Sequence, residues 1–124
     1  MRTGKVIHFT EKEEEFASLL IKIGTRRNVA KVLVFLASTP EATSRAIEQC
    51  AELRQSEVSI AMHYLIGKSW ITRRDSKPES KGRVVRIYRL SRPFHEIMDV
   101  IENEKNKEAA NQLALVQKLQ YYLR

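Results

Sequence analysis

The chain has 124 residues, of which 43% are hydrophobic and 30% charged, a mixture typical of one globular domain with a buried core. No apolar run is long enough to span a bilayer and no signal peptide is visible, which argues against a membrane protein and against secretion. Cys50 is the only cysteine, so an internal disulfide is excluded, and a cytoplasmic location is expected.

The formal net charge is +7, and the excess is concentrated in residues 70–92. This basic segment holds eight Lys or Arg and two Asp or Glu. A concentrated basic segment is typical of a surface that binds a polyanion, whereas solubility alone would be served by spreading the charge.

The first predicted helix follows a short apolar lead-in, Val6–Phe9. Thr10 and Glu13 have the spacing of a capping box, which predicts a helix that begins at Thr10 and ends at Gly24. Its apolar residues are expected to share one face: Phe16, Leu19, Leu20 and Ile23.

A second helix is expected from a cap at Thr25 to the breaker Pro40. Its expected buried residues are Val29, Val32, Leu33, Phe35 and Leu36. Arg26, Arg27 and Lys31 lie near its start, where positive charge opposes the helix dipole. They are either close to an external phosphate or part of an ordinary surface.

Two short helices joined by a turn follow, which is the helix-turn-helix arrangement. The third helix is expected to be capped by Ser44 and to run to about Glu52. The fourth is expected to be capped by Ser56, with Glu57 in its first turn, and to be closed by Gly67 in the left-handed conformation.

The fourth helix has two different faces. One is a buried stripe with spacings of three and four: Val58, Ala61, Met62 and Leu65. The other, which we call the outer face, consists of Ser56, Ser59, Ile60 and His63. Because the outer face lacks the long Glu and Lys side chains of an ordinary solvated helix, it is a candidate for contact with DNA bases. The competing interpretation is an ordinary amphipathic helix.

The basic segment is expected to form a β-hairpin. Residues 69–72 are rich in β-formers, and residues 83–90 alternate between apolar and polar side chains. The polar residues 73–82 between them would form a basic loop, or wing. The order of helix, helix, recognition helix and hairpin is that of a winged helix-turn-helix protein, so the expected fold class is mainly α (α+β), with flanking N- and C-terminal helices.

The C-terminal segment is expected to be helical from Pro93 onwards. A first apolar stripe contains Phe94, Ile97, Met98 and Ile101. After the polar residues 102–108 a second stripe is suited to packing on another helix: Ala109, Leu113, Val116, Gln120 and Leu123. The two stripes are out of phase, which favours a bend or two separate helices. The expected division is 1–24 for the N-terminal arm and helix, 25–92 for the DNA-binding domain and 93–124 for a dimerisation segment.

Residues 53–62, 67–71 and 81–90 together resemble archaeal winged helix-turn-helix transcriptional regulators related to the MarR, ArsR and TrmB groups. The resemblance covers about residues 24–90. It implies a cytoplasmic protein, usually a homodimer, that binds double-stranded DNA at promoters or operators. Related regulators often have Arg or Lys where this chain has Ile60, which argues against direct guanine recognition from that position.

On this interpretation the residues expected to face base edges are Gln55, Ser56, Ser59, Ile60 and His63. Those expected to hold backbone phosphates are Thr43, Ser44, Arg45 and Arg54. The wing is expected to touch the backbone or the minor groove through Lys77, Lys81 and Arg83.

A homodimer is expected because the terminal helices have apolar residues that the core alone does not cover. The expected dimerisation residues are Phe16, Leu20, Leu113, Val116 and Leu123. The competing hypothesis is a C-terminal helix that folds back on its own domain.

No metal site, cofactor or enzymatic activity is expected. His8, His63 and His95 are far apart in the sequence, and no glycine-rich loop could cradle a phosphate. Cys50 is expected in the core and is a weak candidate for a redox sensor. Two alternatives remain: a winged-helix module that binds protein, and a nonspecific nucleic-acid-coating protein. The sequence does not identify an effector ligand or an operator. It also does not indicate whether the protein activates or represses transcription.

Overall fold

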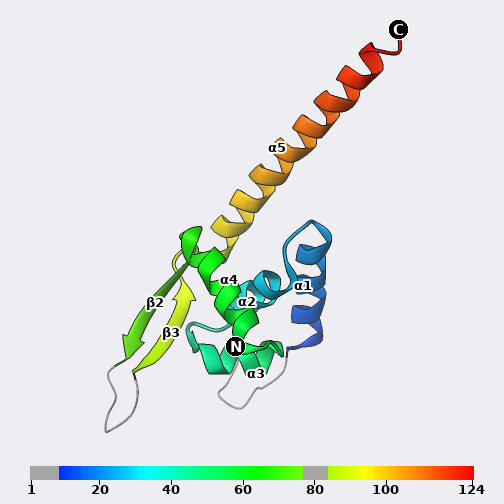
Figure 1. Ribbon diagram of the computed structural model, residues 1–124. Helices are drawn as coiled ribbons and strands as arrows, with labels where there is room; N and C mark the ends of the chain where they lie inside the picture. The colour runs from blue at the N-terminus through cyan, green and yellow to red at the C-terminus, as the bar shows by residue number, and fades with distance from the viewer. Residues whose placement is uncertain (1–8, 77–83) are drawn as a thin grey trace. The chain divides into compact units, whose positions relative to one another are not determined.

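The computed structural model describes residues 9–76 and 84–124, which fall into two units, residues 1–91 and 92–124 (Figure 1). The expected DNA-contacting residues Lys77, Lys81 and Arg83 lie outside the described residues, as does the lead-in before Phe9. Among the described helices, none combines the length and apolar character that a membrane-spanning helix needs.

Helix α1 (Glu11–Lys22) begins with the predicted capping box. Thr10 Oγ1 accepts a hydrogen bond from the Glu13 amide at 3.1 Å, and the Glu13 carboxylate accepts one from the Thr10 amide at 2.9 Å. Glu13 is turned inward, where Ser38 Oγ donates to its carboxylate at 2.6 Å. The buried face of α1 therefore runs through Glu13, Ala17 and Leu20.

The four apolar residues predicted for one face of α1 share that face by helical spacing, but only one of them is buried. Leu20 is buried in its own chain with 2% of its surface exposed, whereas Phe16, Leu19 and Ile23 remain exposed. Leu20 thus contributes to the core, and its side chain is not available to a second copy of the protein. Phe16 is 37% exposed, and its predicted role in dimerisation stays a prediction.

Helix α2 (Arg27–Ser38) supplies much of the core of the first unit. The five predicted residues are all buried, together with Ala30 and Val34. The predicted cap Thr25 is wrong: its amide donates to the Leu20 carbonyl, so Thr25 belongs to the turn that closes α1, and Arg26 occupies the cap position. Gly24, with φ of 108°, provides the left-handed residue of that turn.

Helices α3 (Ser44–Ala51) and α4 (Gln55–Gly67) form the helix-turn-helix pair, and both begin earlier than predicted. Thr43, not Ser44, caps α3 by accepting from the Ala46 amide at 3.1 Å. Ser56 does not cap α4. Instead the Glu57 carboxylate accepts a hydrogen bond from the Arg54 amide at 2.8 Å, which places the helix start at Gln55. Leu53 in the turn between α3 and α4 is buried.

The end of α4 differs from the prediction that Gly67 adopts the left-handed conformation. Gly67 is the last helical residue and has no positive φ, whereas Ser69, two residues later, has φ of 63°. The Ser69 amide donates to the Ile66 carbonyl and the Trp70 amide to the Leu65 carbonyl, so the closing turn extends past the glycine. Gly67 therefore occupies a position that does not require glycine.

We expect Gly67→Ala to stabilise the protein. A Cβ at this position would meet no atom within 4 Å, and alanine loses less conformational entropy in a helix than glycine does. The free energy of unfolding should rise by about 0.5–1 kcal/mol, as measured by urea denaturation. A decrease would show that the backbone at residue 67 requires glycine after all.

The sheet has the strand order β1-β3-β2 and is antiparallel: β1 is Ala42–Thr43, β2 is Ile71–Ser76 and β3 is Val85–Leu90. Ile71 pairs with Leu90 and Arg73 with Tyr88, and both Ile71 and Tyr88 are buried. The hairpin was predicted, but β2 is longer than expected. Arg73 and Arg74 lie in the strand and not in a loop, because the β3 ladder continues past the buried residues as far as Val85.

The second unit contains α5 (Phe94–Tyr121), one continuous helix of 28 residues. The predicted bend or break is therefore wrong. Residues 102–108 contain no Gly or Pro and are mostly good helix formers, and Lys105 and Glu108 form an ion pair at 3.1 Å, so the polar stretch continues the helix. Ile97 and Ile101 are buried, whereas the later apolar side chains are exposed.

Candidate nucleic-acid interface

The two faces of α4 are arranged as the periodicity predicts. Val58, Ala61, Met62 and Leu65 are all buried, which fixes the helix on the core of the first unit beside α2 (Figure 1). All members of the outer face are exposed, and Gln55 is exposed with them. Ile60 is the most exposed large hydrophobic residue of α4, with 54% of its surface in solvent.

The chemistry of the outer face suits close approach to another polar surface. Ser56 and Ser59 have short side chains that both donate and accept hydrogen bonds, and His63 adds an imidazole. Since none of these side chains is long, the helix backbone could come near a partner without displacing them. Exposure of the Ile60 side chain to water is unfavourable. Contact of this side chain with a methyl group, such as that of thymine, would be favourable.

The residues expected to hold phosphates surround the start of α3 and α4. Arg45 and Arg54 are exposed, and within the part of the chain that the structure describes neither forms an ion pair. Thr43 and Ser44 are half-buried, and the Thr43 hydroxyl already accepts a hydrogen bond as a helix cap. Thr43 can therefore still donate, but its position is fixed by the fold of its own chain.

The cations near the start of α2 have partners inside the protein. Lys31 Nζ donates to the Ala51 carbonyl at the end of α3, at 3.1 Å. Arg27 Nη1 lies 3.3 Å from Glu57 Oε2. These contacts give both residues an internal role, which the sequence pattern had left open.

The described arginines of the hairpin differ in how far they are neutralised. Arg74 pairs with Glu41 at 2.8 Å, and Arg73 lies 4.0 Å from Asp75. Arg86 and Arg89 are exposed and form no ion pair among the described residues. Sequence reasoning did not single out Arg86 and Arg89, although both belong to the basic segment, because it could not tell which cations would find an acidic partner.

The order and packing of these elements decide the fold: α2, α3 and α4, followed by a hairpin whose second strand pairs with β1. The chain has a winged helix-turn-helix fold. This confirms the predicted fold class, and β2 with β3 is its wing.

Solved structures share this fold at low sequence identity. A possible transcriptional regulator from Methanosarcina mazei Go1 matches with a TM-score of 0.60 and 18% identity, over 81% of this chain and 82% of that chain. A MarR family regulator from Neisseria meningitidis matches with a TM-score of 0.52 and 17% identity, over 89% and 87% of the two chains. No family model matches the sequence, and no curated protein matches it.

A third similar structure is longer than this winged-helix chain. A MarR family transcriptional regulator from Silicibacter pomeroyi DSS has a TM-score of 0.53 and 18% identity, over 81% of this chain and 64% of the other. At these identities the similarity establishes the fold alone. It does not transfer any residue's role.

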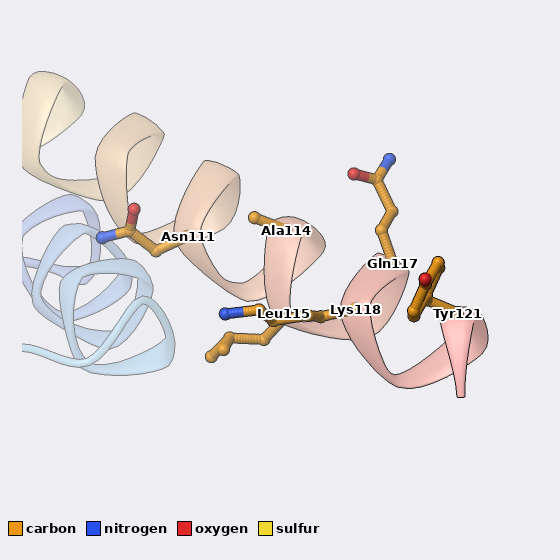
Figure 2. Close-up of a pocket in the computed structure, with 6 residues that line it drawn as sticks. All are labelled: Asn111, Ala114, Leu115, Gln117, Lys118 and Tyr121. Carbon is orange, nitrogen blue, oxygen red and sulfur yellow. The ribbon is translucent and has the colours of Figure 1, made fainter.

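Outside the wing and α4, one hollow lies on α5. Figure 2 shows its lining residues: Asn111, Ala114, Leu115, Gln117, Lys118 and Tyr121. All six come from one helix, α5. Since no second element is among the lining residues, the hollow cannot enclose a small molecule, and we assign no ligand to it.

A second, smaller hollow of about 240 Å³ lies on the wing and is lined by Glu41, Thr72, Arg73, Arg74, Ile87 and Arg89. The Glu41 carboxylate neutralises Arg74 there, so Arg89 is the lining arginine without an ion pair among the described residues. Within residues 9–76 and 84–124, no three His, Cys, Asp or Glu side chains are grouped so that they could hold a metal ion. Cys50 is buried and free of disulfide.

Proposed function

We propose that this protein is a sequence-specific transcriptional regulator that binds double-stranded DNA at promoters or operators. The outer face of α4 would lie in the major groove, and the wing would contact the backbone or the minor groove. The observation that carries the proposal is an exposed helix face of short polar side chains and Ile60, directly opposite a fully buried stripe. The structures that share the fold, described as transcriptional regulators, support it.

On this proposal the chain acts by binding and not by catalysis, and it acts in the cytoplasm. Gln55, Ser56, Ser59, Ile60 and His63 would face base edges. Thr43, Ser44, Arg45 and Arg54 would fix the register on phosphates. Like the expected wing residues Lys77, Lys81 and Arg83, Arg89 would contact the DNA backbone or the minor groove. It is exposed and forms no ion pair among the described residues.

We further propose that the DNA-binding form is a homodimer. After residue 109, α5 has apolar side chains over about half of its circumference, and Leu113, Val116 and Leu123 are exposed. Phe16 on α1 is exposed as well. Two copies would place two recognition helices about one DNA turn apart, on a two-fold symmetric site.

Selection of binding sites from random duplexes tests the proposal. The expected result is one enriched motif made of two related half-sites with centres about 34–36 Å apart. Binding of equal strength to all duplexes, without an enriched motif, would favour a nonspecific nucleic-acid-coating protein. Failure to bind any duplex would favour a winged-helix module whose partner is a protein.

Substitutions on α4 and on the wing should have different effects. Ser59→Ala should weaken binding to the selected site by roughly 1–3 kcal/mol and relax the preference at one base pair, because a hydrogen bond to a base edge is lost. Gln55→Ala should behave in the same way at a neighbouring base pair.

Arg89→Ala should instead weaken binding to all sequences and lower the slope of log affinity against log salt by about 0.9, because one phosphate contact is lost. Fluorescence anisotropy on the selected and a scrambled duplex, at several salt concentrations, measures both effects. Arg74→Ala is the matched control, since Glu41 already neutralises that cation. The same profile for Ser59→Ala and Arg89→Ala would refute the division of roles.

A further inference from the structure

Glu57 makes three contacts, one that caps the recognition helix and two that connect this helix to α2. Its carboxylate accepts a hydrogen bond from the Arg54 amide at 2.8 Å, and its other carboxylate oxygen lies 3.3 Å from Arg27 Nη1. Its backbone carbonyl accepts from Asn28 Nδ2 at 3.0 Å. The first turn of α4 is thereby tied to the first turn of α2, although the residues are about 30 positions apart in the sequence.

The position of Glu57 poses an electrostatic problem for a DNA-binding helix. The carboxylate is needed to cap α4, yet it lies in the turn that would enter the groove between two rows of phosphates. Its side chain is 36% exposed, so it is not shielded by burial. Like charges that lie closer than the screening length, about 10 Å at 0.1 M salt, repel one another. A Glu57 carboxylate without a compensating cation would therefore oppose binding to any duplex.

We propose that Arg27 is a positioning residue that neutralises Glu57, so that the cap of the recognition helix can approach DNA. The inference rests on the proposed DNA-binding function and specifies how one ion pair serves it. Arg27 comes from α2, and its guanidinium is directed at the carboxylate on α4. In this role Arg27 acts through Glu57 and needs no contact of its own with a phosphate.

The inference predicts that removing the charge at residue 57 restores the affinity that is lost when Arg27 is removed. Arg27→Ala leaves Glu57 uncompensated and should weaken binding to a random duplex about fivefold at about 0.1 M salt. Glu57→Gln removes the charge but keeps an amide oxygen that can accept from the Arg54 amide. Because the Coulomb contributions of the two charges add, Glu57→Gln alone should bind more tightly than the wild-type chain, and the double variant should bind within about twofold of the wild-type chain.

A double-mutant cycle measured by fluorescence anisotropy tests this, with thermal unfolding of each variant as a check on folding. Arg26→Ala is the matched control, because Arg26 is the adjacent exposed arginine and has no acidic partner among the described residues. Its effect, whatever its size, should be the same with Glu or Gln at residue 57. If the ion pair had only a structural role, Glu57→Gln would not restore the affinity that Arg27→Ala loses, because Glu57→Gln breaks the same pair.

A double variant that binds as weakly as Arg27→Ala alone would overturn the inference and would indicate that Arg27 contacts DNA directly. That outcome would leave the proposed function standing. A wild-type chain that binds no duplex at any salt concentration would overturn the proposed function and this inference with it. The two failures are therefore distinguishable in one set of measurements.

Discussion

Replacing both Leu113 and Val116 by glutamate is expected to convert the protein from a dimer into a monomer. The two side chains are 58% and 48% exposed and lie three residues apart on α5, so they project from the same side of the helix. Apolar surface of this kind contributes about 25 cal/mol per Å² when a second copy covers it. Two added carboxylates on that surface would face their symmetry copies and repel them.

The loss of the dimer should have a large effect on DNA binding. A dimer bound to two half-sites holds the second recognition helix at a high effective concentration, which commonly raises affinity by roughly 100-fold or more. The glutamate variant should therefore bind the selected two-half-site duplex about 100-fold more weakly. Its affinity for a duplex with one half-site should be nearly unchanged. Analytical ultracentrifugation and anisotropy titrations measure the two effects.

Asn111→Glu provides the matched control. Asn111 lies two positions before Leu113 and therefore on nearly the opposite side of the helix, beside the hollow over Ala114 (Figure 2). Asn111→Glu adds one carboxylate to the same helix, where the double variant adds two, and it should leave both the dimer and DNA binding intact. If the Leu113 and Val116 variant stays dimeric, the interface lies elsewhere, and the exposed α1 residues Phe16, Leu19 and Ile23 become the candidates.

The second large effect is expected from Leu65→Ala. Leu65 lies on the buried stripe of α4 and has 0% of its surface exposed, so truncation leaves a cavity between α4 and the core. The free energy of unfolding should fall by about 2–5 kcal/mol, a large part of the stability of a domain of this size. Urea denaturation followed by circular dichroism measures the change.

Ile60→Ala on the same helix separates stability from recognition. Ile60 is on the outer face, and its truncation should change the free energy of unfolding by less than about 0.5 kcal/mol. It should instead alter the base preference at one position of the selected motif, because an apolar contact with a base is removed. If Ile60→Ala destabilises the fold as much as Leu65→Ala does, the outer face has a partner inside the protein and is not a DNA-contacting surface.

Local patterns in the sequence were enough to predict most of the elements and the two faces of the recognition helix. The capping box of Thr10 and Glu13 is a contact between residues three apart, so its geometry is determined by neighbours. The buried stripe of α4 follows from helical periodicity, which is likewise local. The hairpin was predicted by alternation, and the order of the elements then predicted the winged-helix fold.

Only the tertiary structure decided features that depend on distant partners. The packing of α1 on α2 buries Leu20 and leaves Phe16 exposed, although helical spacing places both on the same apolar face of α1. The length of β2 depends on pairing with β3, and the charge of the wing depends on Glu41 reaching Arg74 from 33 positions away. The pairing of Arg27 with Glu57, which are 30 positions apart, could likewise not be predicted from the sequence. Long-range contacts of this kind are set by how whole elements pack, and a single sequence carries no local pattern that specifies them.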